Sequence, residues 1–425
     1  MSGLNFMEKL LDLSAEQAGG VAVEWKSLGD ECDFVNGFAF KSNLFTVSGL
    51  PIIRITNIDG ITVNLSDVKF FDPSDYRENM QNYSVVKGDI LIAMSGATTG
   101  KIGFYSYDTT AYLNQRVGKF APHRDSLVNR YLYHFLLSKV EEIYILAGGG
   151  AQANLSSNKL MDKLLIPIPC PDNPKTSLEI QAEIVRILDT FTELTTELKA
   201  ELKARKKQYN YYRDQLLNFE EEEVEWKTLG EVGEFTYGYA AKAQDSGDAR
   251  FVRITDININ GKLLQTDAKF VDISDGNKKF ILKKDDLLMA RTGATFGKTM
   301  IFEEDYPAIY AGFLIKLDLD KDTINPKYYW HFAQSEIFWY QANKLVSGGG
   351  QPQFNANALR EVKLPIPYPK DPEKSLAEQA RIVAILDKFD ALTTSITEGL
   401  PREIELRQKQ YEYYRNLLLN FPKET

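Results

Sequence analysis

Two long stretches of the chain carry hydrophobic residues at every third or fourth position. Side chains at that spacing lie along one side of a helix. At about 1.5 Å per residue, a helix of roughly forty residues is about 60 Å long. Alone, such a helix would expose its apolar seam to water, so we expect the two helices to pack on each other as a coiled coil. The seam positions include Ile184, Leu188, Phe191, Leu198 and Tyr212 in the first stretch, and Ile382, Leu386, Phe389, Ile396 and Tyr414 in the second.

The two stretches differ in length at one place. Phe191 precedes Tyr209 by 18 positions, whereas its counterpart Phe389 precedes Tyr411 by 22. The difference is close to one helical turn, so the seam is kept, and the sequence Gly-Leu-Pro at 399–401 predicts a break in the second helix. The tyrosines that lie off the seam are expected to dock helices of partner proteins. They are Tyr211 and Tyr413.

The whole chain is a tandem repeat. EWKSLG at 24–29 returns as EWKTLG at 225–230, and SGATTGK at 95–101 returns as TGATFGK at 292–298. A period of about two hundred residues is far longer than that of a solenoid, so each half is predicted to be one globular domain followed by one long helix. The predicted segments are 1–175 (a globular domain with an N-terminal helix), 176–220 (the first long helix), 221–373 (the second globular domain) and 374–425 (the second long helix).

Within each globular domain, short hydrophobic runs alternate with turns. β-Branched or alternating residues predict strands at 52–58, 89–94, 101–105 and 164–168. One helical pattern, 129–146, lies among them and is matched by 326–346 in the second half. This mixture predicts an α+β fold.

Composition excludes several classes of protein. The 425 residues contain two cysteines and three scattered histidines without zinc-site spacing, and we expect the histidines to be structural or exposed. A basic region followed by an apolar core is absent from the start of the sequence, and no apolar run reaches the length of a membrane span, so we expect a cytoplasmic protein. The net charge of −9 argues mildly against nucleic acid as a partner, although basic and acidic residues are clustered locally.

The glycine-lysine turns are candidates for chemistry. They resemble phosphate-binding loops, but only three residues separate the glycines and no helical pattern follows, so we reject a nucleotide site. Hydroxyls, backbone N–H groups and lysines at such turns suit DNA phosphates, and arginine can bind guanine. The alternative is an ordinary β-turn with solvated side chains. The residues concerned are Ser95, Thr98, Thr99 and Lys101 in the first half, and Arg291, Thr292, Thr295 and Lys298 in the second.

Three further groups of polar residues are considered for DNA contact. The first follows two glycine triplets, and its Gln and Asn side chains suit adenine, although such loops can also be plain connections. The second contains two lysines next to aromatic residues that are expected to pack. The third, Arg54, Asn57, Arg253 and Asp256, is interpreted as an exposed strand face. The first two groups are Gln152, Asn154, Gln351, Gln353 and Asn355, and Lys41 and Lys242.

The repeat suggests how such a chain reaches DNA. If the two helices pack antiparallel, a pseudo-twofold axis relates the two halves and places the globular domains at opposite ends. Equivalent groove faces of B-DNA recur about every 34 Å, so two such domains suit a bipartite site with an unread spacer. Because the loops of the two halves differ, the two half-sites are expected to differ.

The repeated motifs resemble those of one known family. EWK(S/T)LG, the glycine-lysine turns, the IPIP strand, LxxQxxIVxxLD and KQYxYYRxxLLxF each occur twice. Over essentially the full chain the sequence resembles the specificity subunits of type I restriction–modification systems. One departure is Ile180 before Gln181, where the second copy has Glu378 before Gln379. It puts a shared role of the glutamate in doubt, but not the helix.

The resemblance implies a fold, partners and an absence of catalysis. It implies two target-recognition domains separated by two long antiparallel helices, in a subunit that binds DNA and is not itself an enzyme. It further implies two modification subunits that methylate adenine with S-adenosylmethionine, and restriction subunits that use ATP and Mg²⁺. No metal or cofactor is expected on this chain.

Two rival hypotheses stay open at this point. A coiled-coil scaffold that binds only proteins would show no sequence-specific DNA binding. A nucleotide-dependent enzyme built on the glycine-lysine turns would bind ATP or S-adenosylmethionine as an isolated chain.

Overall fold

The computed structural model describes residues 22–150, 153–220, 223–348, 351–395 and 397–421. The predicted N-terminal helix, Gln152 and Ile396 lie outside these ranges. The contacts divide the chain into two compact units. We name residues up to 197 together with 405–425 the first unit, and residues 198–404 the second unit.

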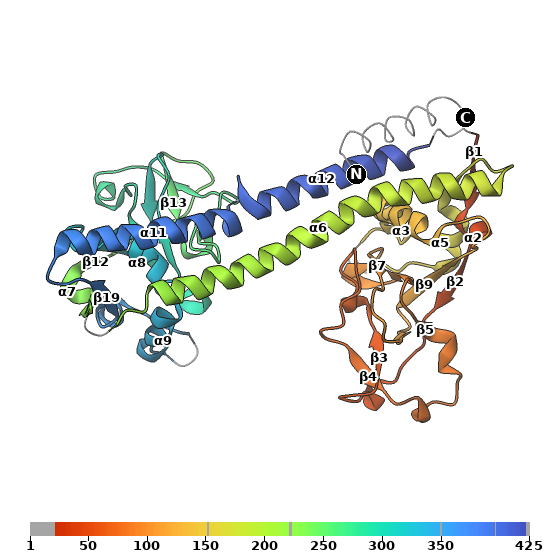
Figure 1. Ribbon diagram of the computed structural model, residues 1–425, viewed down its shortest axis with the longest axis horizontal. Coiled ribbons are helices and arrows are strands. Elements are labelled where there is room, and N and C mark those ends of the chain that lie inside the picture. Colours follow the sequence, from red (N-terminus) through yellow and green to blue (C-terminus); the bar gives the residue numbers. More distant parts are fainter. Residues whose placement is uncertain (1–21, 151–152, 221–222, 349–350, 396, 422–425) are drawn as a thin grey trace. The chain divides into compact units, whose positions relative to one another are not determined.

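The first unit is strand-rich (Figure 1). One four-stranded sheet has the order β2-β9-β6-β7, a second has the order β4-β3-β8-β5, and β1 pairs with β10. All neighbours are antiparallel except β3 and β8. The strands are β1 Val23–Ser27, β2 Cys32–Asn36, β3 Leu50–Ile53, β4 Lys69–Phe71, β5 Ser84–Val85, β6 Ile90–Ala93, β7 Ile102–Phe104, β8 Ala111–Leu113, β9 Val117–Pro122 and β10 Leu165–Pro169.

The second unit repeats this plan. Its four-stranded sheet has the order β12-β18-β15-β16, its smaller sheet the order β14-β13-β17, and β11 pairs with β19. Here too one pair, β13 and β17, is parallel. The strands are β11 Val224–Thr228, β12 Gly233–Tyr237, β13 Ala249–Val252, β14 Phe270–Val271, β15 Leu287–Ala290, β16 Thr299–Ile301, β17 Ala308–Tyr310, β18 Leu314–Leu319 and β19 Lys363–Pro367.

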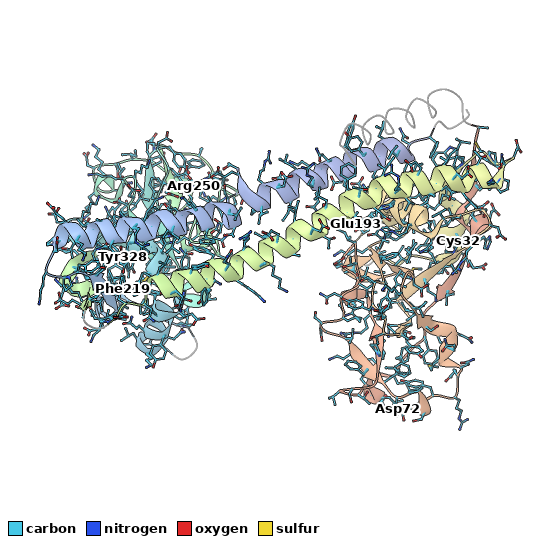
Figure 2. All side chains as sticks on the ribbon, in the orientation of Figure 1. Cys32, Asp72, Glu193, Phe219, Arg250 and Tyr328 are labelled. Atoms are coloured by element: carbon cyan, nitrogen blue, oxygen red, sulfur yellow. The ribbon has the colours of Figure 1, made fainter. Side chains whose placement is uncertain are left out.

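In each unit, equivalent short helices pack on the strands through buried side chains. Tyr328 lies buried inside the second unit (Figure 2), where its hydroxyl donates to the Pro365 carbonyl at 2.9 Å. Tyr131 makes the same contact to Pro167 in the first unit, at 3.0 Å. The domain helices are α2 Leu28–Glu31, α3 Asn129–Ser138, α4 Val140–Leu146 and α5 Ser157–Lys163 in the first unit, and α7 Leu229–Val232, α8 Pro326–Phe332, α9 Glu336–Leu345 and α10 Ala356–Arg360 in the second.

The long helices begin and end where the local chemistry dictates. α6 (Pro174–Leu216) and α11 (Pro372–Thr394) both start with proline, whose missing N–H costs nothing in a first turn. α12 (Gly399–Leu419) follows a break after Thr394, as predicted. Gly399 has φ +76°, and a Cβ there would lie 2.5 Å from the Ala391 carbonyl oxygen, so the break requires glycine.

Within each unit the long helices pack antiparallel. In the first unit, Phe191 of α6 stacks on Tyr414 of α12 at 5.3 Å between ring centroids. Ile184, earlier in α6, shares a core with Leu418, later in α12, and with Phe421, just past the end of α12. In the second unit, Tyr212 of α6 stacks on Phe389 of α11 at 5.5 Å. Leu217, just past the end of α6, shares a core with Ile382, earlier in α11. The predicted antiparallel helix pairing is therefore confirmed inside both units.

The predicted packing residues separate into two classes. Ile184, Leu188, Ile382 and Leu386 are fully buried, and Phe191 nearly so. The side chains off the seam, Tyr211 and Tyr413, are 61% and 63% exposed, so the helices leave them free for other contacts. Leu198 is half-buried.

Three details of the predicted secondary structure are wrong. The strand predicted at 52–58 ends at Ile53, because Asn57 caps a 3₁₀ turn by accepting from the Arg54 N–H at 2.9 Å. The helix predicted at 129–146 is two helices, interrupted at Lys139. The helix predicted at 326–346 is likewise divided, between α8 and α9.

The exposed strand face predicted for four polar residues is also wrong. Asn57 and Asp256 are buried and close equivalent 3₁₀ turns. Arg253 donates to Asp256 at 2.7 Å, so this guanidinium is held inside its own domain.

Candidate nucleic-acid interface

The glycine-lysine turns connect adjacent antiparallel strands. Residues Gly96–Thr98 form a 3₁₀ turn between β6 and β7, and Gly293–Thr295 form the same turn between β15 and β16. Gly96 and Gly293 have φ of +79° and +68°, a conformation that favours glycine. Because strands lie on both sides, neither turn offers a helix N-terminus to a nucleotide.

Each turn meets two other loops at one end of the four-stranded sheet. In the first unit, the Met94 N–H donates to the Arg116 carbonyl at 2.8 Å, and the Leu155 N–H donates to the Met94 carbonyl at 2.7 Å. The Gly96 N–H donates to Ala153 at 3.1 Å. We call residues 94–96, 114–116 and 153–155 the first loop cluster.

The second unit contains an equivalent cluster. The Arg291 N–H donates to the Phe313 carbonyl at 3.1 Å, and the Phe354 N–H donates to the Arg291 carbonyl at 2.8 Å. The Gly293 N–H donates to Pro352 at 3.0 Å. We call residues 291–293, 311–313 and 352–354 the second loop cluster. The backbone bonds correspond one to one, so the two clusters share a framework and differ in their side chains.

The structure brings several predicted DNA contacts together in these clusters. Ser95 and Asn154 face each other as an isolated β-bridge, and Thr292 and Gln353 form the corresponding bridge. Two segments predicted separately from sequence, a glycine turn and a glycine-triplet loop, are therefore one surface. Within it, Asn154 is exposed and Gln353 is half-buried.

Other predicted contacts are engaged inside the domains. Thr99 is buried, and its hydroxyl donates to the carbonyls of Gly96 and Ala153 at 2.7 and 3.0 Å. The Asn355 side chain caps α10 by accepting from two backbone N–H groups at 3.0 Å. The Thr295 hydroxyl donates to the Thr292 carbonyl at 3.2 Å. These polar groups stabilise the loops locally.

Two hydroxyls in the first cluster region have no hydrogen-bond partner among the described residues. The buried Ser95 Oγ and Thr98 Oγ1 make no hydrogen bond within the described part of the chain. Lys101, which ends this turn, is half-buried, and Gln351 is exposed beside the second cluster. The two other predicted lysines, Lys41 and Lys242, are exposed and lie in a different loop, which follows β2 or β12.

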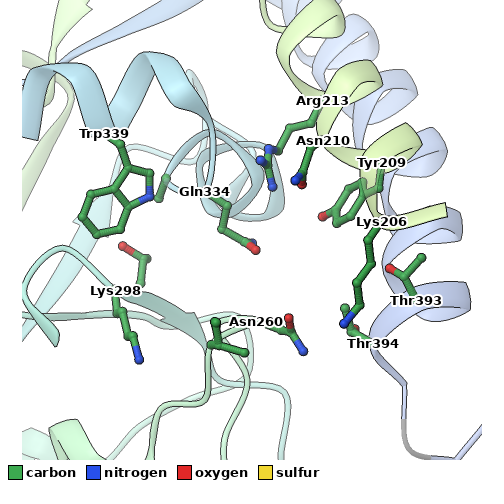
Figure 3. Close-up of a pocket in the computed structure, with 14 residues that line it drawn as sticks. Lys206, Tyr209, Asn210, Arg213, Asn260, Lys298, Gln334, Trp339, Thr393 and Thr394 are labelled. Atoms are coloured by element: carbon green, nitrogen blue, oxygen red, sulfur yellow. The ribbon is translucent and has the colours of Figure 1, made fainter. Parts of the chain in front are cut away.

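Lys298 lies across a cavity from the long helix of its own unit (Figure 3). It helps to line this cavity of about 340 Å³ between the globular part of the second unit and α6. Lys206 and Arg213 of α6 line it too, and the described lining residues include no acidic side chain. Arg213 is 7% exposed, and its Nε has no hydrogen-bond partner among the described residues. The cavity therefore concentrates positive charge.

A buried histidine links each domain to both long-helix segments of its unit. His331 of α8 accepts a hydrogen bond at Nδ1 from the Tyr209 hydroxyl of α6 at 3.0 Å, and donates from Nε2 to Asp387 of α11 at 2.8 Å. In the first unit, His134 of α3 makes the same bonds to Tyr411 of α12 at 2.8 Å and Asp189 of α6 at 2.9 Å. Each domain thus binds a tyrosine that the other repeat supplies.

Sequence reasoning treated these histidines as scattered and missed the network. The available signal was their position: His134 lies in Tyr-His-Phe and His331 in Trp-His-Phe, at equivalent places in the two repeats. His123 has no such counterpart and is exposed, with its ring 3.6 Å from Asp33.

The histidine networks predict acid sensitivity. Burial, the largest influence, lowers the pKa of His134 and His331 below the ordinary 6.5. Below pH 6.5 the unfolded chain therefore binds more protons at these histidines than the folded chain does. The contribution of the two histidines to stability is fully present above pH 6.5 and declines as the pH falls below it. We expect urea-unfolding free energies to decrease between about pH 7 and pH 5. A variant with both histidines changed to glutamine should show a flatter pH profile, and an equally steep one would contradict the assignment.

The aspartates of these networks titrate at lower pH. Burial by itself raises the pKa of Asp387, but the hydrogen bond from His331 and the charges of His331 and Lys327 outweigh it and hold that pKa below the ordinary 3.8. Asp189 is held low in the same way by His134 and Arg130. Their contribution to stability is lost only as pH falls further.

Two properties of the described residues bear on other functions. No helix in the described ranges is both long and apolar enough to cross a membrane. Among the same residues, no three His, Cys, Asp or Glu side chains gather as a potential metal site.

Comparison with known proteins gives one consistent result. The family described as "Type I restriction modification DNA specificity domain" matches residues 21–205 and again 221–406. The "Type I restriction enzyme EcoR124I/EcoR124II specificity subunit" of Escherichia coli is 36% identical over 438 aligned positions, covering 100% of this chain and 98% of that protein. A "putative type I restriction enzyme specificity subunit" of Haemophilus influenzae is 34% identical, covering 98% of each.

A solved structure agrees at the level of the fold. The type I restriction–modification S subunit from M. genitalium matches with a TM-score of 0.55 at 16% identity, covering 96% of this chain and 98% of that one. Two copies of one domain, at residues 21–205 and 221–406, account for the tandem repeat. The chain belongs to the type I restriction–modification DNA specificity family, and it is a non-catalytic subunit that recognises DNA sequence.

Proposed function

We propose that this chain reads an asymmetric bipartite DNA site, with one half-site bound by each recognition domain. The observation that carries the proposal is the pair of loop clusters, which share their backbone hydrogen bonds but not their side chains. A shared framework with different side chains is suited to presenting two different recognition surfaces in equivalent ways. The segments 1–175 and 221–373 are proposed as the recognition domains, and 176–220 and 374–425 as the spacer helices.

Phosphate contacts would place each domain on the duplex. Net charge is −9, so binding depends on local positive charge rather than on the whole chain. Lys41, Lys101 and Lys242 are proposed as phosphate contacts, and the basic cavity that contains Lys298 suits an anionic group of the same kind. The exposed Asn154 and Gln351, with the half-buried Gln353, are proposed to contact base edges.

The partners are proposed from the family and from the helices. Two modification subunits that methylate adenine with S-adenosylmethionine, and restriction subunits that use ATP and Mg²⁺, would assemble on this chain. Tyr211 and Tyr413 are exposed aromatic residues on the long helices, and aromatic side chains of this kind anchor protein interfaces. They are proposed to receive helices of the modification subunits.

One experiment tests the proposal against a protein-only scaffold. Methylated adenines are mapped across the genome of cells that carry the modification subunits with and without this chain. A bipartite methylated motif that depends on the chain is the expected result. A scaffold without DNA specificity would leave the set of methylated sequences unchanged when the chain is removed, which would overturn the proposal.

A further inference from the structure

An arginine has changed strands between the two loop clusters. In the first cluster, Met94 on the β6 side lies opposite Arg116 on the β9 side. In the second cluster, Arg291 occupies the position of Met94, and Phe313 occupies the position of Arg116. Each cluster therefore contains one arginine and one apolar residue in the same cross-strand pair, in opposite order.

The exchange keeps the guanidinium on the same side of the sheet. Residues directly opposite each other in antiparallel strands project from the same face, with Cβ atoms about 5 Å apart. The register Ala93↔Val117 continues to Met94 and Arg116, and Ala290↔Leu314 continues to Arg291 and Phe313. Both clusters consequently place one arginine in the same cross-strand pair and on the same face of the sheet, on opposite strands of that pair.

Arg253 is bound to a carboxylate of its own domain, whereas no described carboxylate binds the guanidinium of either Arg116 or Arg291. Arg116 is exposed and makes no ion pair or side-chain hydrogen bond within the described chain. Among the described residues, the Arg291 guanidinium donates only from Nε, to the Gly312 carbonyl at 3.2 Å. Both therefore keep the outer edge of the guanidinium available, and that edge is the part that forms two parallel hydrogen bonds with a planar acceptor.

The aromatic surroundings hold Arg291 in place. Its guanidinium carbon lies 5.1 Å from the centre of the Tyr237 ring and 5.5 Å from that of Phe313. It also borders an apolar hollow of about 530 Å³ that includes Phe313 and Tyr239. A guanidinium fixed between two rings loses little rotational freedom on binding, which favours base recognition over a loose phosphate contact.

We propose that Arg116 and Arg291 are equivalent specificity-determining residues, each binding the O6 and N7 atoms of one guanine in its own half-site. The inference rests on the proposed function and names what part of each half-site is read. Bidentate binding of guanine is the commonest specific contact that arginine makes in the major groove. Because the two arginines project from opposite strands of the same pair, the two guanines need not occupy matching positions in the half-sites.

The test changes each arginine separately in the complete modification complex. Arg116→Gln should relax or replace the guanine at one position of the first half-site, and Arg291→Gln should do so in the second, because glutamine favours adenine. The preference for guanine at that position should fall about tenfold to a hundredfold, while the other half-site and the spacer length stay unchanged. The readout is the methylated motif, obtained by sequencing methylated adenines.

Matched controls lie at the far ends of β9 and β18, the strands that Arg116 and Phe313 precede. Arg124→Gln and Lys321→Gln remove exposed cations that follow β9 and β18, whereas Arg116 and Phe313 precede those strands. These variants should leave every position of the motif unchanged. Conservative Arg116→Lys and Arg291→Lys variants retain the charge but lose the two parallel N–H donors of the guanidinium. They should weaken the preference for guanine less than glutamine does.

Three outcomes would overturn the inference. One is an unchanged motif in both glutamine variants. Another is uniformly weaker methylation of an unchanged motif with a shallower salt dependence, which would make the arginines phosphate contacts. The third is that the control variants alter the motif to the same degree. If the unaltered chain directs no bipartite methylated motif, the proposed function itself is refuted. The two failures are therefore distinguishable.

Discussion

A chain that carries the first recognition segment twice is expected to direct methylation of a palindromic bipartite sequence. In this variant, residues 20–170 replace residues 221–368, so both half-sites are read by the same side chains. Two identical domains related by a twofold axis must read the same half-site on opposite strands, as twofold-symmetric DNA-binding dimers do. The original asymmetric motif should disappear completely, and the spacer should keep its length.

The hydrogen bonds between each buried histidine and the long helices are the reason to expect the transplanted domain to pack on those helices. His134 of the inserted copy would replace His331, and would meet Tyr209 and Asp387, which have the same identity as its native partners Tyr411 and Asp189. Methylated-adenine sequencing measures the outcome. The converse chain, carrying the second segment twice, should produce a palindrome of the other half-site.

A further control exchanges the two segments within one chain. Under the pseudo-twofold relation expected from the repeat, this exchange is equivalent to reading the same site from the other strand, so the methylated motif should not change. A direct repeat of one half-site in the duplicated chain, in place of a palindrome, would show that the two domains are not inverted with respect to each other.

Replacing Gln379 with leucine is expected to destabilise the second unit by about 3 kcal/mol. This fully buried glutamine accepts from the Asn325 N–H at 2.9 Å and donates to the Thr323 carbonyl at 2.9 Å. Leucine has a similar volume but leaves both backbone groups without a partner, and each such group costs about 1–3 kcal/mol. Urea unfolding of the full chain measures the loss.

The neighbouring residue provides a matched control. Glu378→Ile creates the residue pair found in the first repeat, where Ile180 precedes Gln181. Glu378 is half-buried and pairs at 2.7 Å with the exposed Arg381 one turn along the same helix, so this change should cost about 0.5 kcal/mol or less. Similar losses in the two variants would mean that the glutamine bonds contribute no more than the exposed ion pair.

The same comparison explains the departure noted in the repeated motif. Gln181 makes the bonds of Gln379, accepting from the Val128 N–H at 2.8 Å and donating to Ser126 at 2.9 Å. The glutamine ties each long helix to the loop before a domain helix. The preceding residue, glutamate in one copy and isoleucine in the other, lies outside this contact.

The sequence by itself determined the tandem repeat, the α+β class and the two long helices with the break near Gly399. These features are local or self-similar, because periodic burial and proline or glycine positions act over a few residues. The shorter elements were predicted less well. Asn57 ended a strand early through a side-chain bond to the backbone, which hydrophobic pattern does not reveal.

Only the tertiary structure decided which distant residues meet. His134 and Tyr411 are 277 positions apart, and their hydrogen bond depends on how two helices pack against one domain. Arg116 did not stand out in the sequence, because it becomes equivalent to Arg291 only when strand register places Met94 opposite it. Register and helix packing arise from burial of many side chains at once, so no local pattern contains them.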